Sequence, residues 1–222
     1  MYCDIPTSRL LLRPVQTNEE GSIDLERFHT LWSNEQATKW SKRGPCPTLA
    51  ESKAWMANIV PMPMPTNNLC VSYFVLYAEG DGGFVHPVNV DEKDWKMAGI
   101  VTLLPTDCKL ADESLTYARG AEGDPKVLEL GFLFTPEVWG NGFATESVRA
   151  VIHVYRRDVQ PTNALFPREI LALVHEKNAG SRRVLQKAGF KEVHQSEAIE
   201  WLPLVDDSKT QKHTVVHFRM AD

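Results

Sequence analysis

The segment 128–146, LELGFLFTPEVWGNGFATE, has the composition of a ligand-binding turn between a strand and a helix. Its first half is apolar and runs into a turn that holds Gly140 and Gly142, and a helical pattern begins directly at Phe143. Glycines let the backbone approach a ligand closely, and the unpaired N–H groups of a first helical turn attract an anion. The segment therefore predicts a cradle for a pyrophosphate group, although a tight turn with packing glycines has the same sequence pattern.

Two common phosphate-binding fingerprints do not fit this segment. No third glycine follows the Gly-x-Gly pair in register, which excludes the dinucleotide fingerprint of doubly wound folds. No Gly-Lys-Ser/Thr sequence follows the pair either, which excludes a P-loop.

Histidine is the side chain whose charge changes near neutral pH, and three histidines deserve mention because of their places on predicted strands. His175 ends the strand 169–174, where it could relay a proton or simply hydrogen-bond to nearby backbone groups. His213 and His217 share one face of a C-terminal strand, but the sequence offers no third ligand beside them. We therefore expect no metal site.

The composition limits the classes of function. The chain has 222 residues, of which 43% are hydrophobic, and no linker-like run divides it, so we expect one domain over residues 1–222. A formal net charge of −5 argues against binding to nucleic acid. No apolar stretch is long enough to span a bilayer, and four scattered cysteines are typical of reduced thiols in a cytoplasmic protein.

Periodicity predicts strands and helices that are interspersed along the chain. Capping signals support the helices: Glu51 follows Thr48 by three residues, as in a capping box, and Gly189 stands where a helix ends. The predicted strands are 7–14, 70–77, 97–104, 127–134, 169–174, 191–199 and 214–220. The predicted helices are 25–40, one that follows Thr48, one that starts at Phe143, and 179–187.

This order of elements predicts an α/β or α+β layer structure, in which helices flank a mixed sheet. Two segments are expected to be loops or insertions, because 79–94 is Gly-rich and acidic and 106–126 is polar and weakly patterned. The acidic segment could line the entrance to a site for a cationic ligand, or it could be a solvated surface loop.

Four segments in sequence order resemble motifs of the GNAT superfamily of N-acetyltransferases, in its RimJ/RimL-like branch. PEVWGNGFATES resembles the pyrophosphate loop of that family, and NAGSRRVLQKAGF resembles the motif after its fifth strand. TSRLLLRP and ELGF resemble its first and fourth strands. Two positions depart from the family pattern, since Glu137 replaces the usual Gln or Arg and Leu185 stands where many members have a tyrosine acid.

The resemblance implies a GNAT fold, in which the fourth and fifth strands of the sheet splay apart and acetyl-CoA lies between them. It implies an enzyme that transfers an acetyl group from acetyl-CoA to a primary amine of a small molecule or a protein N-terminus, by direct attack in a ternary complex. A monomer or homodimer is expected, and a CoA-binding regulatory module without turnover is the alternative. The residues that the resemblance assigns to acetyl-CoA are Phe132, Leu133, Phe134, Glu137, Val138, Trp139, Gly140, Asn141, Gly142, Phe143, Ala144, Thr145, Asn178, Ser181 and Lys187.

The resemblance also assigns roles in the chemistry. Glu129 matches the fourth-strand glutamate of the family and is the expected base, acting directly or through water, although a solvated strand glutamate would look the same. Ser181 is the expected substitute for the tyrosine acid, close to the sulfur, or else it caps a helix. Trp40 and Glu129 are expected to bind the acceptor, and Trp40 belongs to the first two helices, which form the floor of that site in the family.

Overall fold

The computed structural model describes residues 3–60, 70–106, 127–159, 169–199, 202–206 and 211–220. Within them one mixed sheet runs in the order β1-β2-β3-β5-β6-β7-β9-β8, and β4 pairs with the end of β3. Neighbouring strands are antiparallel except for β6 and β7. The strands are β1 (Ile5–Pro6), β2 (Leu11–Pro14), β3 (Val71–Gly80), β4 (Gly83–Val85), β5 (Lys96–Thr106), β6 (Val127–Phe134), β7 (Glu169–His175), β8 (Phe190–Ile199) and β9 (Lys212–Met220).

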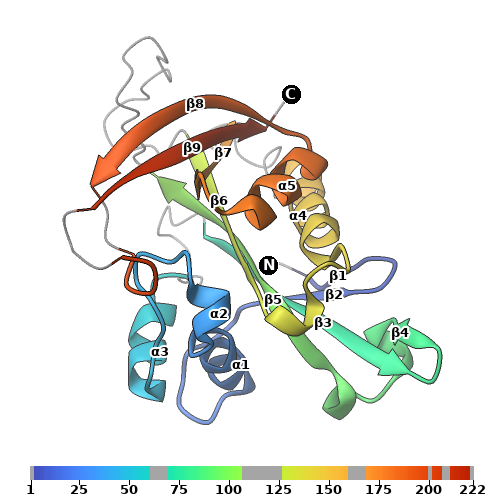
Figure 1. The fold of residues 1–222 in the computed structure, drawn as a ribbon. Helices are drawn as coiled ribbons and strands as arrows, with labels where there is room; N and C mark the ends of the chain where they lie inside the picture. Colours follow the sequence, from blue (N-terminus) through green and yellow to red (C-terminus); the bar gives the residue numbers. More distant parts are fainter. Residues whose placement is uncertain are drawn as a thin grey trace.

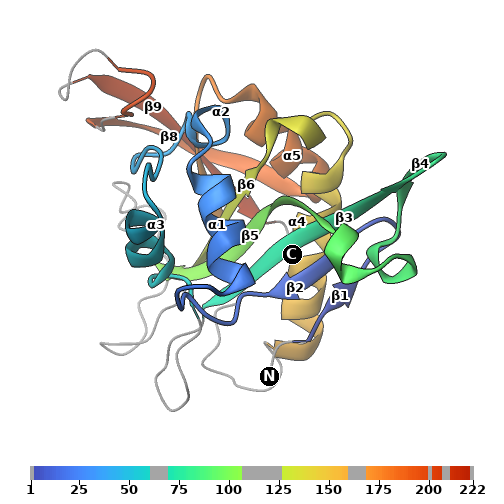
Figure 2. The same cartoon turned by 90° about the horizontal axis from the view of Figure 1, so that it is seen from below.

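Helices cover both faces of this sheet, with α4 and α5 on one face and α1, α2 and α3 on the other (Figures 1 and 2). Each face has its own buried core, one that includes Val148 and Leu185 and another that includes Phe28 and Met56. The helices are α1 (Ile23–Trp32), α2 (Glu35–Thr38), α3 (Leu49–Met56), α4 (Phe143–Val154) and α5 (Ala179–Ala188), with short 3-10 turns at Pro87–Asn89, Glu92–Asp94 and Pro136–Val138 and a π-helical turn at Tyr155–Val159. The predicted mixed sheet flanked by helices is confirmed. No helix within the described ranges is long and apolar enough to cross a membrane.

Capping side chains set where four of the five α-helices begin. Ser22, Asn34, Thr48 and Asn178 each accept a hydrogen bond from the backbone N–H three residues further on. α4 differs, because it begins after Gly142, which has no side chain to cap it. Among the α-helices of the described residues, α4 is thus the one whose first N–H groups are left for a partner other than a capping side chain.

The parallel pair β6–β7 is short and leaves the sheet open. Its register includes three residue pairs, from Val127↔Glu169 to Glu129↔Leu171. Beyond Glu129, β6 stays paired with β5 to its end, and β7 stays paired with β9 up to His175. The two strands therefore diverge toward their C-terminal ends. β6 and β7 are the fourth and fifth strands of the predicted GNAT fold, so this divergence is the predicted splay.

The predicted first strand, 7–14, is wrong in its first half. The backbone N–H of Thr7 donates to the carbonyl oxygen of Leu10 (2.9 Å), so residues 7–10 form a turn. The strand begins at Leu11, because the donors of the turn are used elsewhere: the N–H of Leu10 bonds within the turn to Oγ1 of Thr7, and the hydroxyl of Thr7 and the N–H of Arg9 bond to a carboxylate on α4.

Two further predicted elements differ from the structure. The predicted helix 25–40 breaks after Trp32, because the side chain of Asn34 caps a separate short helix. The segment 79–94 is not all loop, since Gly83–Val85 forms a hairpin with the end of β3. The predicted loop 106–126 begins with Thr106, which is the last residue of β5, and its residues 107–126 lie outside the described part of the chain.

Gly99 of β5 lies so close to β6 that no side chain fits there. An added Cβ would lie 2.3 Å from the carbonyl oxygen of Leu133 and 2.6 Å from the ring of Phe134. Because these atoms belong to a paired strand, Gly99→Ala should lower the free energy of unfolding by about 3 kcal/mol, measured by urea denaturation. Gly82→Ala is the matched control, since its Cβ would meet nothing within 4 Å and should change stability by less than about 0.5 kcal/mol. Equal stabilities of the two variants would contradict this account of the strand contact.

Candidate functional site

The turn between β6 and α4 is held by its own hydrogen bonds. The indole N–H of Trp139 donates to the carbonyl oxygen of Phe134 (2.9 Å), and the side-chain amide of Asn141 donates to the carbonyl oxygen of Val138 (3.2 Å). The Val138 side chain is buried in the core and does not face the turn's surface, whereas Trp139 is 54% exposed. The path of the backbone is therefore fixed by the protein itself, and a ligand would not have to order it.

Gly140 and Gly142 both adopt the left-handed conformation, with φ of 83° and 80°. An L-amino acid with a side chain adopts this conformation only with strain. A Cβ on Gly140 would meet no atom within 4 Å, so this side of the turn is open. The open turn leads into the uncapped first turn of α4, which contains Ala144 and Thr145. A backbone cradle for an anion requires this arrangement.

Phe143 begins α4, and its side chain belongs to the core instead of to the open turn. It is 1% exposed, and its ring lies 5.6 Å from the ring of Tyr77 and 4.8 Å from the ring of Phe84, measured between centroids. Since Phe84 lies on β4, the segment 79–94 packs against the start of α4. Its acidic side chain Glu92 pairs with Arg13 on β2.

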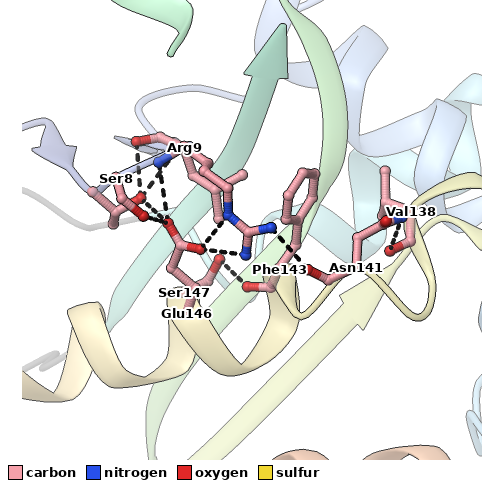
Figure 3. Close-up of polar contacts among 9 residues, drawn as sticks. Ser8, Arg9, Val138, Asn141, Phe143, Glu146 and Ser147 are labelled. Atoms are coloured by element: carbon pink, nitrogen blue, oxygen red, sulfur yellow. Dashed lines mark hydrogen bonds and ion pairs between the residues drawn. The ribbon is translucent and has the colours of Figure 1, made fainter. Parts of the chain in front are cut away.

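An ion pair ties the first turn of the chain to α4 (Figure 3). Arg9 donates to Oε2 of Glu146 from Nε (3.0 Å) and Nη2 (2.6 Å), and it donates from Nη1 to the carbonyl oxygen of Asn141 (3.0 Å). The hydroxyl groups of Thr7 (2.6 Å) and Ser8 (3.1 Å) donate to Oε1 of the same carboxylate. Arg9 therefore holds the glycine turn and the first turn of α4 together.

The carboxyl group of Glu146 is more acidic than usual. Burial by itself would raise its pKa, but the hydrogen bonds from Thr7, Arg9 and Ser8, together with the charge of Arg9, outweigh burial and lower the pKa. The group is therefore a carboxylate at neutral pH, as its five donors require: the four above and the backbone N–H of Arg9 (3.2 Å).

Asn178 and Ser181 lie at the start of α5, directly after β7. The side-chain oxygen of Asn178 accepts from the backbone N–H of Ser181 (3.1 Å), so Asn178 caps the helix and Ser181 does not. Lys187 lies further along, where its carbonyl oxygen accepts a hydrogen bond from Arg149. This bond involves only the backbone of Lys187, so the predicted contact of its side chain with the phosphates stays a prediction.

The residues of β6 alternate between the two faces of the sheet. Phe134 is buried in the core with α4 and α5, and Phe132 packs against that core, whereas Leu133 packs against the core on the α1–α3 face. Because side chains alternate along a strand, Glu129 points to the same face as Leu133. Glu129 is half-buried at the closed end of the splay, opposite Leu171.

A row of rings and one carboxylate lies at the open end of the splay, on the α1–α3 face. Trp40 stacks on His175, with ring centroids 4.7 Å apart and an interplanar angle of 26°. Nε2 of His175 lies 2.9 Å from Nδ1 of His213, whose Nε2 lies 2.8 Å from Oδ2 of Asp206. Nδ1 of His175 accepts from the backbone N–H of Lys177 (3.1 Å). The side chains of His213 and Asp206 are 5% and 0% exposed.

The electrostatics of this row favour a neutral histidine and a charged aspartate. Burial lowers the pKa of His175, and the neighbouring His213 lowers it further. Burial would raise the pKa of Asp206, but the hydrogen bonds from the N–H of Leu202 and from His213 outweigh it, and this pKa is lowered.

Sequence patterns identify candidates for the site but not the partners of these residues. Glu146 stands in the quoted motif, but nothing near it in the sequence points to Arg9. His175 and Trp40 were both candidates, whereas Asp206 was not, because only the pairing of β9 with β7 brings its neighbour His213 to the site. Within the described ranges, no group of three or more His, Cys, Asp or Glu residues is placed to hold a metal ion.

Comparisons with known proteins give the family and the fold. A family model described as an acetyltransferase (GNAT) domain matches residues 9–191. A GNAT-family acetyltransferase from Bacillus anthracis is 15% identical over 98% of each chain, with a TM-score of 0.60. Spermidine N-acetyltransferase from Vibrio cholerae, solved with CoA and spermine, is 16% identical over 96% of each chain, with a TM-score of 0.60. An aminoglycoside acetyltransferase solved with coenzyme A is 16% identical over 96% of this chain and 94% of that chain, with a TM-score of 0.56. A search by sequence among curated proteins found no match.

Replacing Glu146 by Gln tests the anchor between the first turn of the chain and α4. At pH 7, Glu146→Gln should lower the free energy of unfolding by about 2 kcal/mol, because several hydrogen bonds to a charged group are weakened together. Since the folded-state pKa lies below the ordinary 4.5, this stabilisation is complete above pH 4.5 and is lost as the pH falls through the folded-state pKa.

Urea unfolding of both proteins at several pH values measures this difference, which should shrink in acid. Glu197→Gln is the control, because the pair of Glu197 with Lys212 is exposed and should contribute less than about 0.5 kcal/mol. A difference between wild type and Glu146→Gln that stays constant from pH 7 to acid would refute the role of the charge.

Proposed function

This chain belongs to the acetyltransferase (GNAT) family, and from that premise we propose that it transfers an acetyl group from acetyl-CoA to a primary amine of a small molecule or a protein N-terminus. Members of this family are acyltransferases, and acetyl-CoA is their co-substrate. The sequence motifs support a place in the RimJ/RimL-like branch, since W-G-x-G-[YF]-A-[TS]-E is the form of the pyrophosphate loop in that branch and Trp139 to Glu146 match it.

The observation that carries this proposal is the open turn before α4, and it fits the pyrophosphate of acetyl-CoA. The cradle has two left-handed glycines, no capping side chain, and free space where a Cβ of Gly140 would lie. The N–H of Asn141 donates to the carbonyl oxygen of Val138 (3.4 Å), and the other backbone N–H groups from Gly140 to Thr145 would hold the phosphates. The β7-facing edge of β6 around Phe132 to Phe134 would pair with the amides of the pantetheine arm, and Asn178 would bind the same arm.

The reaction needs a neutral amine, a thioester and a destination for one proton. The amine nitrogen forms a bond to the acetyl carbonyl carbon, the carbon–sulfur bond breaks, and the sulfur leaves with the electron pair. A thiol has a pKa of about 8.5, so the thiolate is a tolerable leaving group with modest help. Ser181, at the start of α5, is proposed to lie close to this sulfur.

The acceptor is proposed to bind on the α1–α3 face of the sheet, beside Trp40. Glu129 points to the same face, and we propose that its charge attracts the protonated amine in solution. The net charge of −5 is compatible with a cationic acceptor. The spermidine and aminoglycoside acetyltransferases with similar folds also act on amines, which supports a small polyamine or aminosugar as the first acceptors to test.

A screen of amines for stimulated release of CoA thiol tests the function. The panel contains spermidine, an aminoglycoside, an amino acid, an arylamine and a peptide with a free N-terminus, each with acetyl-CoA. Acetyl transfer predicts that at least one class raises thiol release above the rate without amine. Binding of CoA without any stimulation would favour the regulatory module instead.

Gly142→Asp should abolish the binding of acetyl-CoA while the protein stays folded. Acetyl-CoA at about a hundred times its Kd should raise the Tm of the wild type by about 5 to 10 °C, because the ligand binds only the folded state. The Cβ of the new residue would lie 3.6 Å from Nη2 of Arg9, and we expect its carboxylate beside the glycine turn to repel the pyrophosphate, so the shift should vanish in this variant. Gly21→Asp is the matched control: Gly21 has nearly the same φ, 78° against 80°, and lies in a surface turn before α1. An equal shift in both variants would show that the turn does not bind acetyl-CoA.

A further inference from the structure

The hydrogen bonds of His175 determine which of its nitrogens can act as a base. The backbone N–H of Lys177 can only donate, so Nδ1 of His175 accepts and has the lone pair. The network then assigns the proton of the neutral ring to Nε2, which donates to Nδ1 of His213. His213 in turn donates from Nε2 to Oδ2 of Asp206. All the bonds of the row run in one direction, from the exposed end at Lys177 to the buried carboxylate.

Burial and His213 lower the pKa of His175, and the carboxylate of Asp206 offsets part of this effect when His175 takes up a proton. Protonation at Nδ1 leaves the bond from Nε2 to His213 unchanged and replaces only the contact with Lys177. Asp206 stays negative, since it also accepts from the backbone N–H of Leu202 (2.6 Å) and its side chain has no exposed surface. The carboxylate therefore attracts the imidazolium through His213, as the aspartate does in a serine–histidine–aspartate triad.

The place of His175 also suits a proton acceptor. It ends β7 at the open end of the splay, three residues before Asn178 caps α5. Trp40 covers one face of its ring and fixes the plane of the imidazole. Glu129, at the closed end opposite Leu171, is about 13 Å away along the strand, so one amine proton cannot reach both groups directly.

We propose that His175 is the catalytic base of this acetyltransferase, and that His213 and Asp206 are positioning residues that hold it in its basic form. The inference rests on the proposed acetyl transfer to an amine. When the nitrogen bonds to the acetyl carbon, its proton passes to Nδ1 of His175, directly or through one water molecule. The sulfur leaves with the electrons of the broken bond, and the imidazolium then returns the proton to the thiolate or to water.

The activity should depend on pH through His175. The base must be unprotonated, so kcat should fall as the pH falls through the pKa of His175, which burial lowers first and His213 second. The titratable and charged groups around this ring are Glu176 and Lys177 on its own turn, His213 on β9, Asp206 in the turn before β9, and Lys39, whose ammonium lies over the Trp40 ring.

The test compares three variants with the wild type, using acetyl-CoA and the most reactive amine of the panel. His175→Gln should lower kcat about a hundredfold and remove the bend in the kcat–pH profile, with the Tm shift by acetyl-CoA retained. Asp206→Asn should lower kcat about tenfold and move the bend to lower pH, because an amide stabilises the imidazolium less. Glu129→Gln should raise the KM of the amine about fivefold and leave the bend in place.

His217→Gln is the matched control for a merely structural loss. His217 also lies on β9, is buried like His213, and has its own partner in Ser196 (2.7 Å). This variant should lower the Tm without moving the bend. An imidazole ¹⁵N NMR titration of the wild type gives a measurement that needs no variant to fold: the proton of neutral His175 should lie on Nε2, and its pKa should match the bend.

The outcomes separate this inference from the function on which it rests. If no amine of the panel is acetylated by the wild type, the proposed function fails and the inference fails with it. If an amine is acetylated but His175→Gln keeps the rate and the bend, or if NMR places the proton of neutral His175 on Nδ1, the inference alone is overturned. A hundredfold loss of kcat in Glu129→Gln with an unchanged KM would give the role of base to Glu129.

Discussion

Backbone N–H and C=O groups inside a protein need hydrogen-bond partners. Because β6 and β7 pair over only a short length, their facing edges at the centre of the sheet have backbone groups that the other strand does not pair. β6 is paired with β5 over its whole length and β7 with β9 up to its last residue, but the two strands share only three residue pairs. A strand edge exposed in this way is a template for an extended ligand that offers amide groups of its own. Both α4 and α5 begin close to where these strands end, so a ligand that enters the splay also meets two helix N-termini.

The start of α4 has no capping side chain, and its first turn is stabilised by contacts with residues 7–10 near the beginning of the chain. Arg9 and Glu146 form a two-point ion pair, and the same arginine reaches the carbonyl oxygen of Asn141 in the glycine turn. A capping serine or aspartate needs an extended backbone, whereas Gly142 is left-handed, and a Cβ there would lie 3.6 Å from Nη2 of Arg9. The first N–H groups of α4 therefore stay available to an anion. The contact between the first turn of the chain and α4 thus stabilises the helix start without blocking it.

The parts of the structure that sequence could predict are those with a local signal. The bounds of β6, the start of α4 at Phe143 and the cap at Thr48 each depend on residues within a few positions of one another. The break at Asn34 had such a signal too, since asparagine is a preferred cap. The apolar periodicity of 25–40 nevertheless led to the prediction of one continuous helix. The turn at residues 7–10 had none, because its hydroxyl groups bond to a carboxylate 139 residues away. The partner of His175 lies 38 residues away, and only the order of the strands brings it there.

The two halves of the site use different chemistry, and this difference bears on what a shared fold can say about an acceptor. In the proposed function, the donor half consists of backbone groups at the glycine turn and along β6, which depend on the path of the chain and little on side-chain identity. The acceptor half, in the proposed function, consists of side chains on the α1–α3 face, where Trp40 follows α2, Glu129 belongs to β6 and His175 ends β7. A fold can therefore keep the donor half while these side chains change. Solved acetyltransferases that are 15% to 16% identical to this chain share its fold. The name of one mentions spermidine, a polyamine, and the name of another mentions an aminoglycoside. In the proposed function, what decides the acceptor is therefore the surroundings of Trp40 and His175, where the row of hydrogen bonds that ends at Asp206 holds the position of the imidazole.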